Sequence, residues 1–301
     1  MNMRTLAGLN LLTTGEAADY LRMSERKLYE LVADGAVPCT KVTGKWLFPR
    51  AELDRWLLSG LVRPAGMVPA DPPPIIGGSH DPLLQWALAE SRAGLAMLPE
   101  GSDAGYQRFL KGEVLAAAIH FHNLDDVTAD ANIAVISREA ALYDCVLIAF
   151  AARAQGFVVA KGNPLNIRNL QDAQARKARL IARPDGAGAQ QLLQALMQTA
   201  NMSTRDLPPV IVAPTGPDIA HAIRAGLGDY GIATQAVALA ADMDFIPILT
   251  EHFDLIMRQR DSYRPPLQKL LTLLRSKAFA DHARELGGLN VSQAGQVRHA
   301  P

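Results

Sequence analysis

Apolar residues in the first 35 positions recur at the spacing of two short helices. Thr13 is followed three residues later by Glu16, which is the pattern of a capping box. The residues after it, 17–21, are mostly apolar and continue a helical pattern, so we predict a helix that begins near Thr14.

A second helix is predicted over residues 25–33. Leu28, Leu31 and Val32 share one face of it. Ser24 stands where an N-cap is expected, and Gly35 follows the last periodic residue. Residues off the apolar face near its start are available to contact DNA: Arg26, Lys27 and Tyr29.

Residues 39–49 form two short β-like runs around Thr43 and Gly44, which predicts a hairpin with a tight turn. Lys41 and Lys45 flank its tip. Residues 51–58 then predict a closing helix that completes a very small core. Together these elements indicate a winged helix-turn-helix.

From residue 74 onward, short apolar runs alternate with helical patterns, which predicts an α/β fold. Three apolar runs, 74–77, 94–98 and 114–121, each end in a polar junction. The junctions contain Ser79, His80 and Asp81, then Gly101 and Ser102, then His120 and His122. Because the carboxyl ends of parallel strands meet at one sheet edge, we expect a site for a small polar ligand there. Helix capping by Ser79 or Asp81 explains the first junction equally well.

A second lobe is predicted after residue 150. A strand ends in the turn 161–164, and a Gly-bearing turn runs from Arg183 to Ala189 into a helix over 190–200. That helix start could hold an anion. Residues 245–249 and 255–257 are expected to return the chain to the first lobe, with closing helices at 267–274 and 278–286.

Length and composition indicate two domains. The chain has 301 residues, of which 49% are hydrophobic and 20% charged, as in ordinary globular proteins. A proline-rich stretch that includes Pro64, Pro69 and 72–74 predicts a linker. We therefore expect a DNA-binding domain over 1–60, a linker over 61–73 and a sensor domain over 74–301. Within the latter, lobe 1 comprises about 74–150 and 245–301, and lobe 2 about 151–244.

Net charge, cysteine spacing and hydropathy narrow the class of protein further. The formal net charge is zero, so DNA contacts must come from a local basic surface. Residues 20–50 supply one, with six basic side chains against three acidic ones. Cys39 and Cys145 have neither disulfide-framework nor metal-ligand spacing. The sequence shows no signal peptide and no apolar run long enough to span a membrane, so we expect a cytoplasmic protein.

His120 and His122 would lie on the same face of a strand, an arrangement that can suit a metal-binding site. No third ligand stands near them in the sequence. We therefore predict neither a metal site nor a cofactor.

The N-terminal motifs resemble the excisionase or MerR-type DNA-binding domain. The resemblance covers about 50 residues and is carried by Leu11-Leu12-Thr13-Thr14-x-Glu16-Ala17-Ala18, Ser24-x-Arg26-x-Leu28-Tyr29, Gly35-x-Val37-Pro38 and Lys45-Trp46-x-Phe48-Pro49. It implies double-stranded DNA as a partner, and because DNA sites are commonly two-fold we expect a homodimer or a higher homo-oligomer. The candidate DNA-binding residues are Thr14, Ser24, Arg26, Lys27, Tyr29, Lys41, Lys45 and Trp46.

Residues from about 74 to 298 resemble the periplasmic-binding-protein superfamily, particularly domains similar to molybdate-binding proteins. The motifs are Lys161-Gly162-Asn163-Pro164, Ala225-Gly226-x-Gly228-Asp229-x-Gly231-Ile232-Ala233 and Leu286-Gly287-Gly288-Leu289. The resemblance implies a two-lobed, type II α/β domain and an oxyanion effector such as molybdate or tungstate. Candidate ligand-binding residues are Ser79, His80, Asp81, Gly101, Ser102, His122, Arg183, Asp185, Gly186, Ala187, Gly188 and Tyr230.

One departure from the family pattern weakens the oxyanion assignment. Related domains usually carry a hydroxyl residue and an arginine in the Gly-rich turn, where this chain has Ala187, Ala189 and Gln190. Arg183 and backbone N–H groups could still supply donors.

The leading hypothesis is therefore a ligand-responsive transcriptional regulator that is not an enzyme. An enzyme is one alternative, because His80, Asp81, His120 and His122 could provide acid and base groups. An architectural DNA-binding protein similar to an excisionase is the other, although it would leave the α/β domain unexplained.

Overall fold

The computed structural model describes residues 10–42, 44–61, 71–123 and 130–300. The chain forms two compact units, and residues 135–144 group with the N-terminal one. Thr43 of the expected tight turn and Pro64, Gly66 and Pro69 of the expected linker lie outside the described residues.

The N-terminal unit is built as its local signals predict. Thr13 and Glu16 form the expected capping box at the start of the first helix, and the Ser24 side chain accepts a hydrogen bond from Lys27 N at the start of the second. Gly35 follows the second helix with φ of +63°, which glycine adopts without strain. The elements are β1 (Leu11–Leu12), α1 (Thr14–Tyr20), α2 (Glu25–Ala33), β2 (Phe48–Pro49) and α3 (Arg50–Ser59).

A small apolar core holds this unit together. Its fully buried members include Ala17, Leu28, Phe48 and Leu53, which come from three helices and β2. The hairpin is present, because Thr40 and Leu47 form an antiparallel bridge, and β1 pairs with β2. The unit is thus a helix-turn-helix with a short wing.

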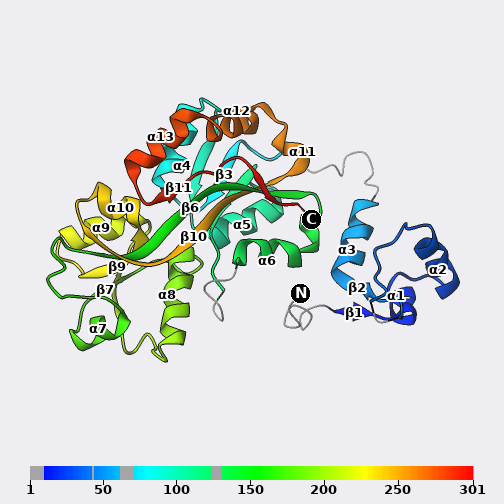
Figure 1. Ribbon diagram of the computed structural model, residues 1–301, viewed down its shortest axis with the longest axis horizontal. Helices are drawn as coiled ribbons and strands as arrows, with labels where there is room; N and C mark the ends of the chain where they lie inside the picture. The colour runs from blue at the N-terminus through cyan, green and yellow to red at the C-terminus, as the bar shows by residue number, and fades with distance from the viewer. Residues whose placement is uncertain (1–9, 43, 62–70, 124–129, 301) are drawn as a thin grey trace. The chain divides into compact units, whose positions relative to one another are not determined.

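One twisted sheet runs through the second unit (Figure 1). Over the described residues its order is β4-β3-β5-β10-β6-β9-β7-β8, with β11 and β12 pairing with β6. The first lobe contains β3 (Ile75–Gly78), α4 (Pro82–Glu90), β4 (Ala96–Pro99), α5 (Ser102–Lys111), β5 (Ala116–Ile119), α11 (Gln259–Ser262), α12 (Pro265–Leu274), α13 (Lys277–Leu286), β11 (Leu289–Asn290) and β12 (Val297–His299). The second contains α7 (Leu170–Ala175), β7 (Leu180–Ala182), α8 (Gly188–Thr199), β8 (Pro209–Val212), α9 (Gly216–Arg224), β9 (Tyr230–Thr234) and α10 (Gln235–Ala240). Helix α6 (Ala131–Arg138) and the 3-10 turn η2 (Ala140–Leu142) follow β5.

Each lobe has its own apolar core. In the first, Phe150 stacks edge-on against Phe253 and Phe279, with ring centroids 5.4 and 5.3 Å apart. In the second, α7 and α8 cover one face of the sheet and α9 and α10 cover the other. Independent cores let the lobes behave as separate rigid bodies.

Two long antiparallel strands join the lobes, β6 (Cys145–Val159) and β10 (Asp244–Arg258). They run side by side through the middle of the unit (Figure 1). The sequence indicated their apolar segments but not their length. Their register shifts between Pro247 and Leu249 and again between Phe253 and Asp254, and such irregularities bend a strand locally.

The α/β class and its main helices are confirmed, with helix ends within a few residues of those predicted. Unpredicted elements include α6, β8 and α10. No helix in the described part of the chain is long and apolar enough to cross a membrane.

Candidate functional site

A cavity in the second unit lies where strands of both lobes end. Its lining residues are Ser79, His80, Pro82, His120, Arg153, Gln155, Arg183, Ala187, Ala189, Gly216, Pro217, Ala233, Thr234 and Val237. Strands β3, β5, β7 and β9 all deliver residues to it at or beyond their carboxyl ends, the usual ligand position in α/β sheets. The free space is about 20 Å³, enough for a single water molecule. A larger ligand therefore requires side chains of the cavity wall to shift.

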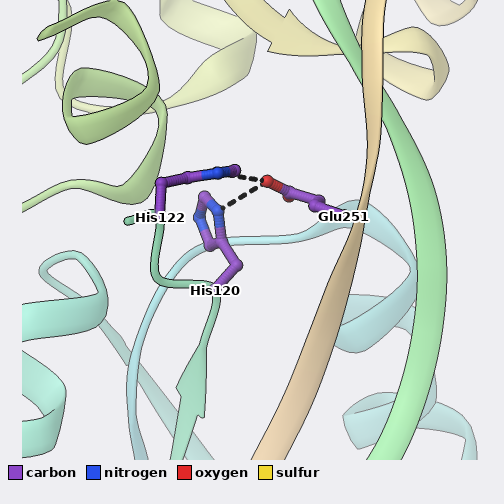
Figure 2. Close-up of side chains that lie close together, drawn as sticks. All are labelled: His120, His122 and Glu251. Carbon is purple, nitrogen blue, oxygen red and sulfur yellow. Dashed lines mark hydrogen bonds and ion pairs between the residues drawn. The ribbon is translucent and has the colours of Figure 1, made fainter. Parts of the chain in front are cut away.

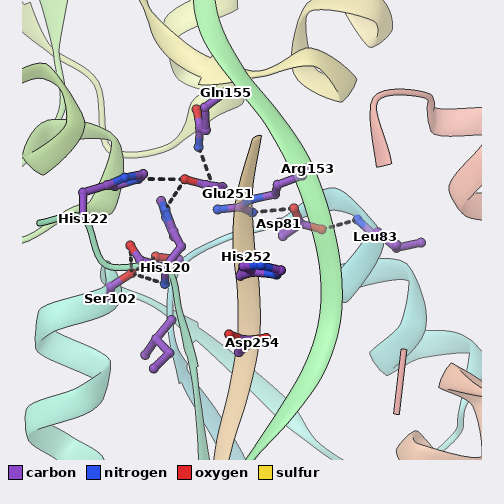
Figure 3. A network of polar contacts seen from close by, with 12 residues as sticks. Asp81, Leu83, Ser102, His120, His122, Arg153, Gln155, Glu251, His252 and Asp254 are labelled. Carbon is purple, nitrogen blue, oxygen red and sulfur yellow. Dashed lines mark hydrogen bonds and ion pairs between the residues drawn. The ribbon is translucent and has the colours of Figure 1, made fainter. Parts of the chain in front are cut away.

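Ser102 ties together the three polar junctions of the first lobe (Figure 3). Its hydroxyl lies 2.8 Å from Ser79 Oγ, accepts from His120 N at 3.0 Å and is 3.3 Å from His120 O. Close packing of α5 on β3 makes this possible, because a Cβ on Gly105 would lie 2.3 Å from Gly78 Cα. The expected convergence of the three junctions is thus present in the structure.

Arg153 forms the centre of a buried ion-pair network (Figure 3). It donates to Asp81 Oδ2 at 2.7 Å and to Glu251 Oε1 at 2.6 Å, and it lies 4.0 Å from the centre of the Phe253 ring. Asp81 Oδ1 caps α4 by accepting from Leu83 N and Leu84 N. Asp81 therefore both caps α4 and pairs with Arg153. Arg153 and Glu251 face each other directly across β6 and β10.

Arg183 supplies the cavity with a cation that forms no ion pair among the described residues, although the charge of Asp218 acts on it from nearby. Burial lowers the pKa of Arg183 to about 10, which leaves it charged at neutral pH. Its Nε atom is buried without a hydrogen-bond partner in the described structure, as are Gln155 Oε1 and Thr234 Oγ1, which line the same cavity. Leaving such groups unpaired costs roughly 1–3 kcal/mol each.

Next to this cavity, His120 and His122 meet Glu251 (Figure 2). Glu251 Oε2 lies 3.1 Å from His120 Nδ1 and 2.8 Å from His122 Nε2. The prediction that both histidines lie on one strand face is wrong, since β5 ends at Ile119 and both belong to the following loop. They converge because the loop turns toward β10.

Described residues of the two lobes touch close to the cavity, as three contacts illustrate. Asp103 N donates to Gly186 O at 3.2 Å, and His122 N donates to Gln191 Oε1 at 3.2 Å. At the third, a Cβ on Gly188 would lie 2.1 Å from His120 O, so only glycine fits there in this arrangement.

The candidate ligand residues divide into four groups by position. Ser79, His80, Arg183 and Ala187 line the cavity. Asp81 and Ser102 bond to lining residues, Arg153 and His120 respectively, and His122 bonds to Glu251 beside the cavity. Gly101, Gly186 and Gly188 lie where the lobes meet. Asp185 is exposed, whereas Tyr230 is buried in the second lobe's core against Phe157, and neither reaches the cavity lining.

Sequence reasoning missed Arg153, Gln155, Thr234 and Glu251. The first two alternate with alanines inside a long apolar stretch, a pattern typical of polar side chains on one face of a buried strand. Glu251 lies about 130 residues from His120 and His122, so no local spacing could reveal it.

The candidate DNA-binding residues lie mostly on the surface of the N-terminal unit. Arg26, Lys27 and Tyr29 are exposed on α2, where Glu30 pairs with both cations at 3.5 and 3.2 Å. Lys41 and Lys45 are exposed on the wing. The remaining candidates have local roles: Ser24 caps α2, Thr14 is half-buried at the start of α1, and Trp46 packs under Lys41 Nζ, 5.1 Å from its ring.

Comparisons with known proteins agree with this two-part architecture. A family model described as a helix-turn-helix domain matches residues 11–60, and one described as a PBP superfamily domain matches residues 85–275. The chain is thus similar in each part to a separate, known family.

One relative matches almost the whole chain, and another matches about a quarter of it. The uncharacterized protein YvgK of Bacillus subtilis (strain 168) is 22% identical over 306 residues, which cover 95% of this chain and 96% of that protein. An uncharacterized protein from the 5′ region of a Clostridium pasteurianum 2Fe-2S ferredoxin gene is 26% identical over 80 residues, covering 26% of this chain and 71% of that protein.

Among solved structures, a similar one comes from Clostridium perfringens and is described as the substrate-binding protein of a phosphate ABC transporter with bound phosphate. The TM-score is 0.52 at 11% identity, covering 71% of this chain and 97% of that one. At this identity the likeness concerns the fold.

Proposed function

Because the chain belongs to the PBP superfamily and carries a helix-turn-helix domain ahead of its PBP domain, we propose that it is a transcriptional regulator controlled by a small anionic ligand. The helix-turn-helix binds double-stranded DNA, and the ligand binds in the cavity between the two lobes.

The observation that carries the ligand proposal is the set of unpartnered polar atoms in the cavity wall. Arg183 Nε and the Thr234 hydroxyl are donors, and Gln155 Oε1 is an acceptor. Together with the positive charge of Arg183, which is not held in an ion pair among the described residues, they suit an oxyanion or a small carboxylate that carries a hydroxyl. Phosphate, molybdate and tungstate are therefore the first ligands to test.

Switching follows from the two-lobed design. A ligand that touches residues of both lobes favours the closed arrangement. The stabilisation equals the difference between its binding free energies for the closed and the open arrangement. In a homodimer, which two-fold DNA sites favour, closure would change how the two DNA-binding domains are presented.

The ligand half of the proposal is tested by a thermal-shift screen of the full chain with phosphate, sulfate, molybdate, tungstate and small hydroxycarboxylates. We expect a rise in Tm with at least one anion, and loss of that rise in Arg183→Met. Arg179→Met is the matched control, because Arg179 lies on the exposed surface of the same lobe, paired with Asp229. No rise with any anion, or an equal loss in the control, would contradict the proposal.

The DNA half is tested by fluorescence anisotropy with a random-sequence duplex at several salt concentrations. Arg26→Ala and Lys45→Ala should each weaken binding and reduce the salt slope by about one, with ligand binding intact. Lys277→Ala removes an equally exposed charge from α13 and should leave the slope unchanged. A slope that falls equally in all three variants would point to diffuse charge attraction without a defined interface.

A further inference from the structure

His120, His122 and Glu251 present three ligand atoms to one point beside the cavity (Figure 2). Each residue offers one donor atom, and all of these atoms lie within 4.8 Å of one another. The cluster consists of two imidazoles and one carboxylate, a combination found in transition-metal sites.

We propose that these three side chains bind a divalent first-row transition-metal ion such as Zn²⁺. Two ligand atoms on one tetrahedral ion lie about 3.3–3.5 Å apart, given metal–ligand distances of about 2.0–2.2 Å. The observed separations from Glu251 Oε2 to His120 Nδ1 and His122 Nε2 are 3.1 and 2.8 Å. Small side-chain rotations are therefore enough to admit the ion in place of the shared hydrogens.

The surroundings of Glu251 resemble the support that metal ligands usually have. Its Oε1 atom accepts from Arg153 Nε at 2.6 Å and from Gln155 Nε2 at 3.0 Å, which leaves Oε2 to the histidines (Figure 3). Such outer hydrogen bonds orient a ligating carboxylate. The backbone of the loop is also held, because Ser102 Oγ accepts from His120 N and Asn132 Oδ1 accepts from Phe121 N.

A carboxylate and a neutral imidazole are the forms that bind metal. Metal binding at this cluster should therefore release protons and weaken as the pH falls.

The local charge also suits a divalent cation. Arg153 carries one positive charge, and Asp81 and Glu251 together carry two negative charges, so the network has a net charge of about −1 before an ion binds. A divalent ion raises this to about +1. His120 lines the cavity, so the ion would stand at its wall and could take an oxygen of the anionic ligand as a further ligand. Only this contact between the ion and the anionic ligand rests on the proposed function.

The test uses the full chain after EDTA treatment and dialysis, titrated with Zn²⁺ by calorimetry and with Co²⁺ by visible absorption. We expect one equivalent per chain and a Co²⁺ spectrum typical of low coordination number. His122→Ala and His122→Gln should weaken binding more than 100-fold. Gln155→Leu, which removes only an outer hydrogen bond, should weaken it about 10- to 100-fold.

His80→Ala is the matched control. His80 lines the same cavity but bonds to Gln85 at 3.1 Å and lies outside the cluster, so metal affinity should persist. Circular dichroism checks that each variant folds. Absence of binding in the wild-type chain, or wild-type affinity in both His122 variants, would overturn the metal site. The titration needs neither DNA nor the anion, so its result is independent of the regulator proposal.

Discussion

Arg153→Met is the most informative change to the buried network. The substitution removes a buried cation and leaves Asp81 and Glu251 as carboxylates without their partner. Breaking one side of a buried ion pair costs about 3–5 kcal/mol. Loss of the contact with the Phe253 ring, at 4.0 Å, adds about 1–2 kcal/mol. We therefore expect the free energy of unfolding of this unit to fall by about 4–7 kcal/mol.

The same substitution should act differently once both carboxylates are neutral. In an Asp81→Asn, Glu251→Gln background, Arg153 is itself the uncompensated buried charge. Replacing it with methionine then removes a desolvated cation, so the change should be neutral or stabilising. This reversal of sign separates a charge effect from a packing effect.

Urea denaturation of the full chain in EDTA measures these differences. The chain has three tryptophans, and replacing Trp46 and Trp56 with phenylalanine leaves Trp86, in the first lobe, as the sole reporter. Arg179→Met is the control, because an exposed ion pair contributes only about 0–1 kcal/mol. An equal loss from Arg153→Met in both backgrounds would refute the electrostatic account and assign the effect to packing.

Three further outcomes are expected. Gly188→Ala places a Cβ 2.1 Å from His120 O, so it should favour separated lobes and weaken anion binding. Solution scattering should then give a larger radius of gyration, and an unchanged radius would contradict this. Burial raises the pKa of Asp254 to about 6, above its ordinary 3.8. The folded state therefore binds an extra proton between those values, and stability falls as pH rises from about 4 to 6. Asp254→Asn should reduce the change in the free energy of unfolding between these pH values by up to about 3 kcal/mol, as measured by urea melts at each pH. A pH profile parallel to that of the wild type would assign the change to other groups. Ser102→Ala leaves the buried His120 N–H without its acceptor, which should cost about 1–3 kcal/mol and lower Tm by about 2–4 °C per kcal/mol; a wild-type Tm would show that another acceptor replaces it.

Local signals explain why much of the fold was predictable. Thr13, Ser24 and Gly35 determine helix ends through bonds that reach only a few residues along the chain. The polar junctions after β3, β4 and β5 were predictable for a similar reason, because each follows a short apolar run and parallel strands bring their ends together. In both cases the information lies within one or two elements.

The site required information that no local pattern contains. Arg153 lies in an apolar stretch, and its burial depends on Asp81 and Glu251, which are 72 and 98 residues away. Glu251 reaches the histidines only because β10 pairs with both β5 and β6. Tyr230 is a different case, since it was a ligand-binding candidate alongside the family resemblance, whereas its ring packs in the second core.

The pairing of β6 with β10 limits how this cavity can change during evolution. Arg153 and Gln155 alternate with Ala152 and Ala154, so an insertion or deletion of one residue would turn the alanines toward the cavity. It would also misalign Arg153 with Glu251. Relatives that recognise other ligands should therefore differ along these strands by point substitutions, whereas the loops after β3 and β4 can also vary in length.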